Sequence, residues 1–131
     1  MTNPRTQTNP NDQKPKSQTY DLEERTFQFA QRVRAFIKKL PRTISNIRDC
    51  GQLADASGSV GANYIEANES LGKKDFLMHA KISLKEAKES RFWLRLVDTG
   101  NAADLESERN WLIQESVELT SIFGSIVSKS Q

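Results

Sequence analysis

Apolar side chains recur every three or four residues along most of this chain, which is the spacing of one face of an α-helix. The first run begins after Asp21, which together with Glu24 forms a helix-start signature. Its apolar positions are Phe29, Val33, Phe36 and Leu40. Because Pro41 cannot continue a helix, we predict the first helix from about Asp21 to Leu40.

Three further runs with the same period follow. They cover about residues 43–69, the stretch from just after Gly72 to about Asp98, and about residues 104–128. Gly100 and Asn101 suit the end of the third run. No segment alternates β-branched and polar residues as a strand does. Because long helices with short connections pack antiparallel, the pattern predicts an all-α, up-down-up-down four-helix bundle over residues 20–131.

The first nineteen residues differ in composition from the rest. Residues 1–19 consist largely of Asn, Gln, Thr, Lys and Pro, and no apolar residue follows Met1. Such a segment cannot bury enough apolar surface to offset the entropy lost on ordering. We therefore expect a disordered tail at residues 1–19, ahead of the bundle domain.

The second run contains small residues where a helix usually carries larger ones. We call one side of it the small-residue face, which consists of Ile44, Ile47, Gly51, Ala54, Gly58, Gly61, Ile65 and Asn68. A second apolar strip lies beside it, made of Leu53, Val60 and Ala67. Each helical glycine costs about 1 kcal/mol relative to alanine, so a packing gain must offset this cost. We predict that Gly51, Gly58 and Gly61 allow a neighbouring helix to approach closely.

Two alternatives exist for the glycines. One is a π-bulge or kink within the helix. The other is a loop that binds phosphate or RNA through G58-S59-V60-G61, but such loops need a flanking strand that the pattern does not provide.

Polar residues also line up on the second helix. A carboxylate on a largely apolar helix needs a partner, and the antiparallel third helix offers cations. The predicted structural network consists of Ser59, Asn63, Glu66, Arg91 and Arg95. The register of antiparallel helices also brings Lys81 and Lys85 close to Glu66. A functional polar site on the bundle surface is the alternative.

Charge is distributed unevenly, although the net charge is only +2. The fourth helix is acidic, while the third carries a stripe that we call the basic row, made of Lys74, Lys81, Lys85, Lys88 and Arg95. Lys73 and Lys74 lie at a helix start, where the dipole disfavours cations and favours phosphate. The candidate phosphate contacts are Lys73, Lys74, Lys81, Lys85 and Lys88. The alternatives are a solvated face, or salt bridges to the fourth helix of the same or another subunit.

Catalytic and metal chemistry find little support in the residues. The single histidine, His79, follows Asp75 by one helical turn, and we expect this to be a surface pair. Cys50, the only cysteine, lacks a histidine partner and is expected to be a small buried hydrophobe. We predict no metal, no cofactor and no enzymatic activity. The absence of a membrane span or secretion signal predicts a cytoplasmic protein without a membrane partner.

Three blocks resemble a known family. They are S57-G58-S59-V60-G61-A62-N63-Y64-I65-E66-A67, then K73-K74-D75-F76, then I82-S83-L84-K85-E86-A87-K88-E89-S90-R91-F92-W93-L94-R95-L96. They look like the bacterial four-helix bundle family that includes the 23S rRNA-intervening sequence proteins. The resemblance implies a left-handed bundle that assembles as a homopentamer. A related bundle, the accessory protein of diversity-generating retroelements, binds nucleic acid through a basic surface and partners a reverse transcriptase.

Together these features predict a non-enzymatic homo-oligomer that binds RNA or DNA through the basic row. The last three helices are apolar on more than one side, which is typical of chains that bury surface against copies of themselves. The alternative is a protein-interaction scaffold without a nucleic-acid role, in which the aromatic end of the third helix docks a protein partner.

Overall fold

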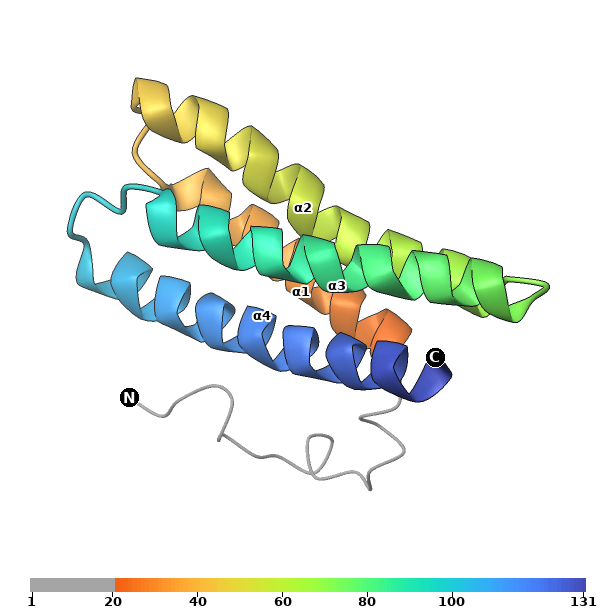
Figure 1. Ribbon diagram of the computed structural model, residues 1–131. Coiled ribbons are helices and arrows are strands. Elements are labelled where there is room, and N and C mark those ends of the chain that lie inside the picture. The colour runs from red at the N-terminus through yellow and green to blue at the C-terminus, as the bar shows by residue number, and fades with distance from the viewer. Residues whose placement is uncertain (1–20) are drawn as a thin grey trace.

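The computed structural model describes residues 21–131, and this part of the chain contains four α-helices and no strand. The helices are α1 (Leu22–Lys39), α2 (Ile44–Asn68), α3 (Lys73–Leu96) and α4 (Ala103–Ser130). They form a bundle of long, roughly aligned rods (Figure 1). The predicted all-α four-helix bundle is confirmed, while its left-handed sense stays a prediction. The predicted tail, residues 1–19, lies outside the described residues.

Hydrogen bonds between the ends of the helices fix their antiparallel order. At one end, Asn68 Nδ2 donates to a Glu23 carboxylate oxygen over 2.8 Å, which joins the end of α2 to the start of α1. At the other end, Asn46 Nδ2 donates to the carbonyl oxygens of Pro41 and Asp98 over 2.8 and 2.7 Å. Asn46 Oδ1 accepts from the Asp98 amide over 2.8 Å. Asn46 is only 2% exposed, so one buried side chain ties the α1–α2 connection to the end of α3.

The core is a single apolar cluster to which all four helices contribute. Its fully buried large side chains include Phe29, Val33, Phe36, Leu53, Val60, Leu94, Leu112, Leu119 and Phe123. The apolar positions predicted for α1 are confirmed, because each lies in this cluster. No helix within residues 21–131 is both long and apolar enough to cross a membrane.

The second apolar strip of α2, and not its small-residue face, lies against the core. Leu53 and Val60, from the second strip, are fully buried. On the small-residue face, Ile44, Ile47 and Ile65 are 82%, 62% and 45% exposed. Glycine and alanine are too small to fill a core at the density of a protein interior, so the leucine–valine strip takes that place. The small-residue face turns partly toward α1 and partly to the surface.

The three glycines of α2 have different roles. A Cβ on Gly61 would lie 2.7 Å from Thr26 Oγ1 and 3.1 Å from Thr26 Cβ, so α1 approaches α2 closely there. At Gly58 the neighbour is the Arg34 guanidinium, 3.1 Å from a built Cβ. Gly51 is exposed and has nothing within 4 Å, so within one subunit the close-packing prediction is wrong at that position. Because α2 is one continuous α-helix through all three, with no π-helical turn, the loop and π-bulge alternatives are wrong.

Candidate nucleic-acid interface

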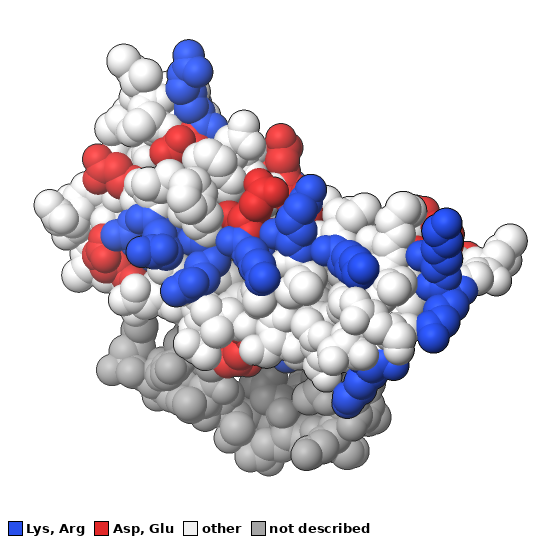
Figure 2. Space-filling model, in the orientation of Figure 1, with Lys and Arg blue, Asp and Glu red and all other residues white. Residues whose placement is uncertain are grey.

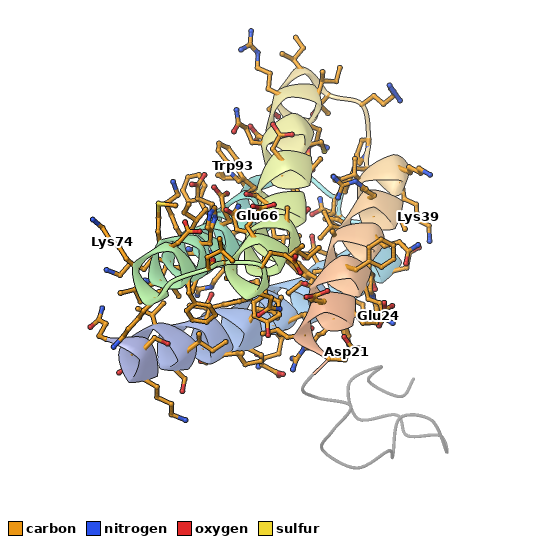
Figure 3. The ribbon with its side chains drawn as sticks, turned by 90° about the vertical axis from the view of Figure 1, so that its right-hand side faces the viewer. Asp21, Glu24, Lys39, Glu66, Lys74 and Trp93 are labelled. Atoms are coloured by element: carbon orange, nitrogen blue, oxygen red, sulfur yellow. The ribbon has the colours of Figure 1, made fainter. Side chains whose placement is uncertain are left out.

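The outward face of α3 carries a dense set of cations. Its exposed basic residues are Lys73, Lys74, Lys81, Lys85, Lys88, Arg91 and Arg95. Figure 2, in the orientation where α3 lies in front, shows Lys and Arg side chains following one another along this helix. In Figure 3, Lys74 projects away from the bundle. The basic row predicted from the sequence is therefore exposed along the length of α3.

Helix geometry sets the length of this surface. At 1.5 Å of rise per residue, the seven-residue step from Lys81 to Lys88 is about 10 Å. By the same measure, the row from Lys74 to Arg95 extends over about 30 Å. This length is comparable with one turn of duplex, about 34 Å, and suits contacts with several successive phosphates.

None of these α3 cations forms an ion pair with a carboxylate of residues 21–131. Three of the acidic residues of α4 pair with α1 instead, while Glu106 pairs with Arg109 of α4 itself. Arg25 bonds Glu115 and Glu118 over 2.8 and 2.9 Å, and Arg32 bonds Glu108 over 2.7 Å. The alternative in which the basic row forms salt bridges with α4 of the same subunit is therefore wrong.

The α1–α4 contact is a feature that the sequence analysis missed. Glu115 is 5% exposed, and its hydrogen bond with Arg25 is the main cause that raises the pKa of that guanidinium. The Arg32 guanidinium carbon also lies 3.6 Å from the centre of the Trp111 ring, a cation–π arrangement. Arg25 and Arg32 are seven residues apart, as are Glu108 and Glu115, so a search for complementary charges at heptad spacing could have found this ladder.

Carboxylates border the basic row on the side of α2. Burial, and next the charge of Glu89, raise the pKa of Glu86, and Asp55 of α2 adds to the effect while Lys85 opposes it. In Figure 2 acidic side chains lie above the row, whereas the surface directly below it, over α4, is mostly uncharged. A polyanion on α3 would therefore be repelled from the α2 side and find no such barrier toward α4.

Apolar side chains interrupt the basic row. Phe92 and Leu96 are each 51% exposed, and Met78 is 49% exposed. The Phe92 ring meets that of Trp93 edge to face, with centroids 5.0 Å apart and an interplanar angle of 83°. The sequence pattern predicted that α3 is apolar on more than one side, and at its end only Leu94 and Val97 are fully covered within this subunit.

The polar network between α2 and α3 differs from the predicted one. Asn63 Nδ2 donates to Ser59 Oγ over 2.9 Å, and Asn63 Oδ1 lies 3.2 Å from His79 Nδ1. His79 Nε2 in turn lies 3.6 Å from Asp75. The expected Asp75–His79 pair thus forms, but it connects to α2 instead of standing alone.

Three predicted members of the network lie outside it. Glu66, Arg91 and Arg95 are exposed, and none of them forms an ion pair within residues 21–131. The prediction that they complete the network is wrong, because an exposed glutamate is satisfied by water and needs no buried partner.

The start of α3 lacks a capping side chain. Gly72 is the N-cap residue, and no side chain bonds the first amides of the helix. Lys73 and Lys74 are both exposed there. Their position at the positive end of the helix dipole is as predicted from the sequence.

The described chain offers little for metal or thiol chemistry. Residues 21–131 contain no group of three or more His, Cys, Asp or Glu side chains that could hold a metal ion. Cys50 is half-buried, and burial, with a smaller contribution from Asp49, raises the pKa of its thiol. A raised pKa keeps the thiol protonated at neutral pH and makes it a poor nucleophile.

Comparisons with known proteins agree with this architecture. The family model of the 23S rRNA-intervening sequence protein matches residues 18–125. A crystal structure of a protein of unknown function from the S23 ribosomal protein family of Bacteroides thetaiotaomicron superposes with a TM-score of 0.69. It is 25% identical in sequence, and the match covers 80% of this chain and 96% of that one. No curated protein matches the chain. With a family model that covers α1 to α3 and most of α4, and a solved relative of the same fold, this chain belongs to the 23S rRNA-intervening sequence protein family.

Proposed function

We propose that this protein is a non-enzymatic, homo-oligomeric bundle that binds RNA or DNA through the basic row of α3. The observation that carries the proposal is that these cations are exposed and form no ion pair within residues 21–131, while the carboxylates of Glu108, Glu115 and Glu118 pair with α1. Binding of a polyanion to an unpaired row of cations releases the counterions that balanced both charges, and the entropy of these released ions favours binding. The family description, which refers to a sequence within 23S rRNA, is compatible with such a partner.

The residues proposed to contact phosphates are Lys74, Lys81, Lys85 and Lys88, with Lys73 as a secondary contact at the helix start. Each phosphate contact contributes about 0.9 to the slope of log affinity against log salt for duplex and about 0.7 for single strands. Binding of this type reads the backbone, so it carries little sequence preference.

A charge-reversal pair tests the proposal. We expect the double variant K85E/K88E to bind labelled oligonucleotides more weakly and with a flatter salt dependence in gel-shift titrations. The matched control is K38E/K39E, which makes the same charge change at two exposed lysines in the last turn of α1. Equal losses of affinity in the two double variants would show that net charge, and not the position of the lysines on α3, governs binding. If nuclease-treated wild-type protein binds neither RNA nor DNA, the proposal fails.

Self-association is proposed from the exposed apolar surface between α1 and α2. A groove there is lined by Thr26, Phe27, Ala30, Gly58, Gly61, Ala62 and Ile65, among others. Phe27 is 57% exposed, and Ile47 and Ile44 continue the apolar surface along α2. Proteins that function as monomers rarely leave an apolar surface of this kind uncovered. The pentameric state is what the family resemblance implies.

Assembly and nucleic-acid binding support each other in this proposal. A closed oligomer repeats the basic row once per subunit, so weak contacts by one subunit become strong in combination. Light scattering before and after nuclease treatment gives the stoichiometry and reveals any nucleic acid that co-purifies. We expect I47K to reduce the molar mass, and an unchanged mass would place the interface elsewhere.

The second candidate function is a protein-interaction scaffold. Phe92 and Leu96 favour it, because exposed aromatic and aliphatic side chains at one helix end could dock a protein partner. Capture of a partner that persists at high salt, together with no binding of RNA or DNA, would support the scaffold over the nucleic-acid function.

A further inference from the structure

An exposed aromatic ring lies within the basic row. Phe92 follows Lys88 by four residues and precedes Arg95 by three, so the three side chains are neighbours on one helix surface. Lys88 and Arg95 are about 10 Å apart along the helix axis, with the ring between them. The ring is 51% exposed, although apolar side chains of this size usually contribute to a core.

The Phe92 ring is braced by the bundle. Its edge-to-face contact with Trp93 joins it to a half-buried side chain that packs against the core. This contact limits the orientations that the ring adopts. A ring that is already restricted loses less entropy when a flat partner stacks against it.

From this arrangement we infer that the nucleic acid bound by α3 is single-stranded, with an unpaired base stacked on Phe92 and the flanking phosphates held by Lys88 and Arg95. The inference rests on the proposed function and specifies its ligand. Aromatic side chains interleaved with cations are the features by which single strands are held without regard to sequence. In a duplex both faces of each base are covered by its neighbours, so no base is free to stack on the ring.

The surroundings of Phe92 agree with this ligand. Phenylalanine has no hydrogen-bonding atoms, so the contact would tolerate any base. The carboxylates of Glu86 and Glu89 lie toward α2 and would keep the strand on the other side of α3. Against a duplex, the ring would instead meet hydrated sugars and phosphates, a contact that strips water from charged groups without a compensating bond.

Affinity of the full-length protein for two probes tests the inference. The probes are a labelled thymidine oligonucleotide of about 16 nucleotides, the upper range of a single-strand site, and a duplex of the same length. We expect F92A to weaken single-strand binding about 10- to 100-fold, the equivalent of one lost base stack. Duplex binding should change less than about twofold, because duplex affinity comes from phosphate contacts that F92A leaves in place. F92W should retain single-strand affinity.

Two controls separate stacking from other effects. L71A removes an exposed apolar side chain from the α2–α3 connection, outside both the basic row and the α1–α2 groove, and should leave the affinities for both probes unchanged. K88A should flatten the salt dependence of single-strand binding by about 0.7, whereas F92A should leave that slope unchanged. Circular dichroism and light scattering show whether each variant keeps its fold and assembly.

The outcomes distinguish the two proposals. If the wild-type protein binds neither probe, the proposed function fails. If it binds both and F92A weakens both equally, or neither, the phosphate surface remains and the stacking inference is overturned. If F92A dissociates the oligomer while L71A does not, Phe92 belongs to a contact between subunits and the inference is likewise wrong.

Discussion

Replacement of Gly61 by alanine tests whether close packing explains the glycines of α2. The new Cβ would lie 2.7 Å from Thr26 Oγ1 and 3.6 Å from the Thr26 carbonyl carbon, so α1 would have to move outward. Alanine gains about 1 kcal/mol in helix propensity, whereas overpacking of a close contact costs about 1–3 kcal/mol. Since the obstacle includes a β-branched side chain whose hydroxyl is bonded to Leu22 O over 2.8 Å, it yields little, and we expect the upper part of this range.

The net expectation for G61A is therefore a loss of about 1–2 kcal/mol in the free energy of unfolding. Urea denaturation followed by circular dichroism measures it as a lower midpoint with an unchanged slope. The matched control is G51A, where nothing lies within 4 Å, and which should gain about 1 kcal/mol from propensity alone. A G61A protein that matches or exceeds wild type in stability would show that α1 does not need a glycine there.

A double-mutant cycle locates the clash. T26A removes the Oγ1 atom nearest to the new Cβ but keeps Thr26 Cβ, 3.1 Å away. G61A should therefore cost less in the T26A background than in wild type, with a coupling of about 0.5–1.5 kcal/mol, as residues in direct contact show. Additive effects would mean that the two positions do not meet.

The remaining predictions concern buried polar groups and pH. N46D should lower unfolding stability by about 3 kcal/mol or more, because a carboxylate would face two carbonyl oxygens that now accept hydrogen bonds; a urea midpoint equal to that of wild type would contradict this. E86Q should stabilise the fold at neutral pH, because burial raises the Glu86 pKa and so makes the ionised carboxylate destabilising in the folded state. The gain should vanish below the unfolded-state pKa of Glu86, where both states are protonated. A gain that persists in acid would refute burial of the charge as its cause. The hydrogen bond from Thr99 is the main cause that lowers the Glu106 pKa. It stabilises the fold above the unfolded-state pKa of Glu106, and this contribution is lost as pH falls through the folded-state pKa. The difference in melting temperature between wild type and T99V should therefore shrink in acid.

Much of the fold follows from local spacing. The helix bounds, the core positions of α1 and the alignment of the lysines depend only on 3.6 residues per turn, on Asp21 as an N-cap and on Pro41 as a stop. The presence of glycines at helical spacing also indicated a close neighbour, which exists at Gly61. These are properties of one helix at a time, so periodicity in the sequence is sufficient to predict them.

Which helix face meets which neighbour could not be predicted in this way. Two adjacent sides of α2 were apolar, and only the space left by the other three helices decided that Leu53 and Val60 fill the core. Likewise, heptad spacing suggests complementary charges on α1 and α4, but only the packing of these two helices decides that Arg25 meets Glu115 across 90 positions. The exposure of Phe92 among the lysines of α3 is likewise decided by which face of α3 packs against the other helices.

The sequence by itself thus determined the four helices, the stop and cap residues, and the chemistry available on each helix face, since these depend on residues within a turn or two of one another. Only the tertiary structure decided which charges neutralise one another and which apolar side chains stay uncovered. Both outcomes depend on the angular position of each helix about its own axis in the bundle. That rotation is set by the packing of all four helices at once, because the interior must be filled without voids.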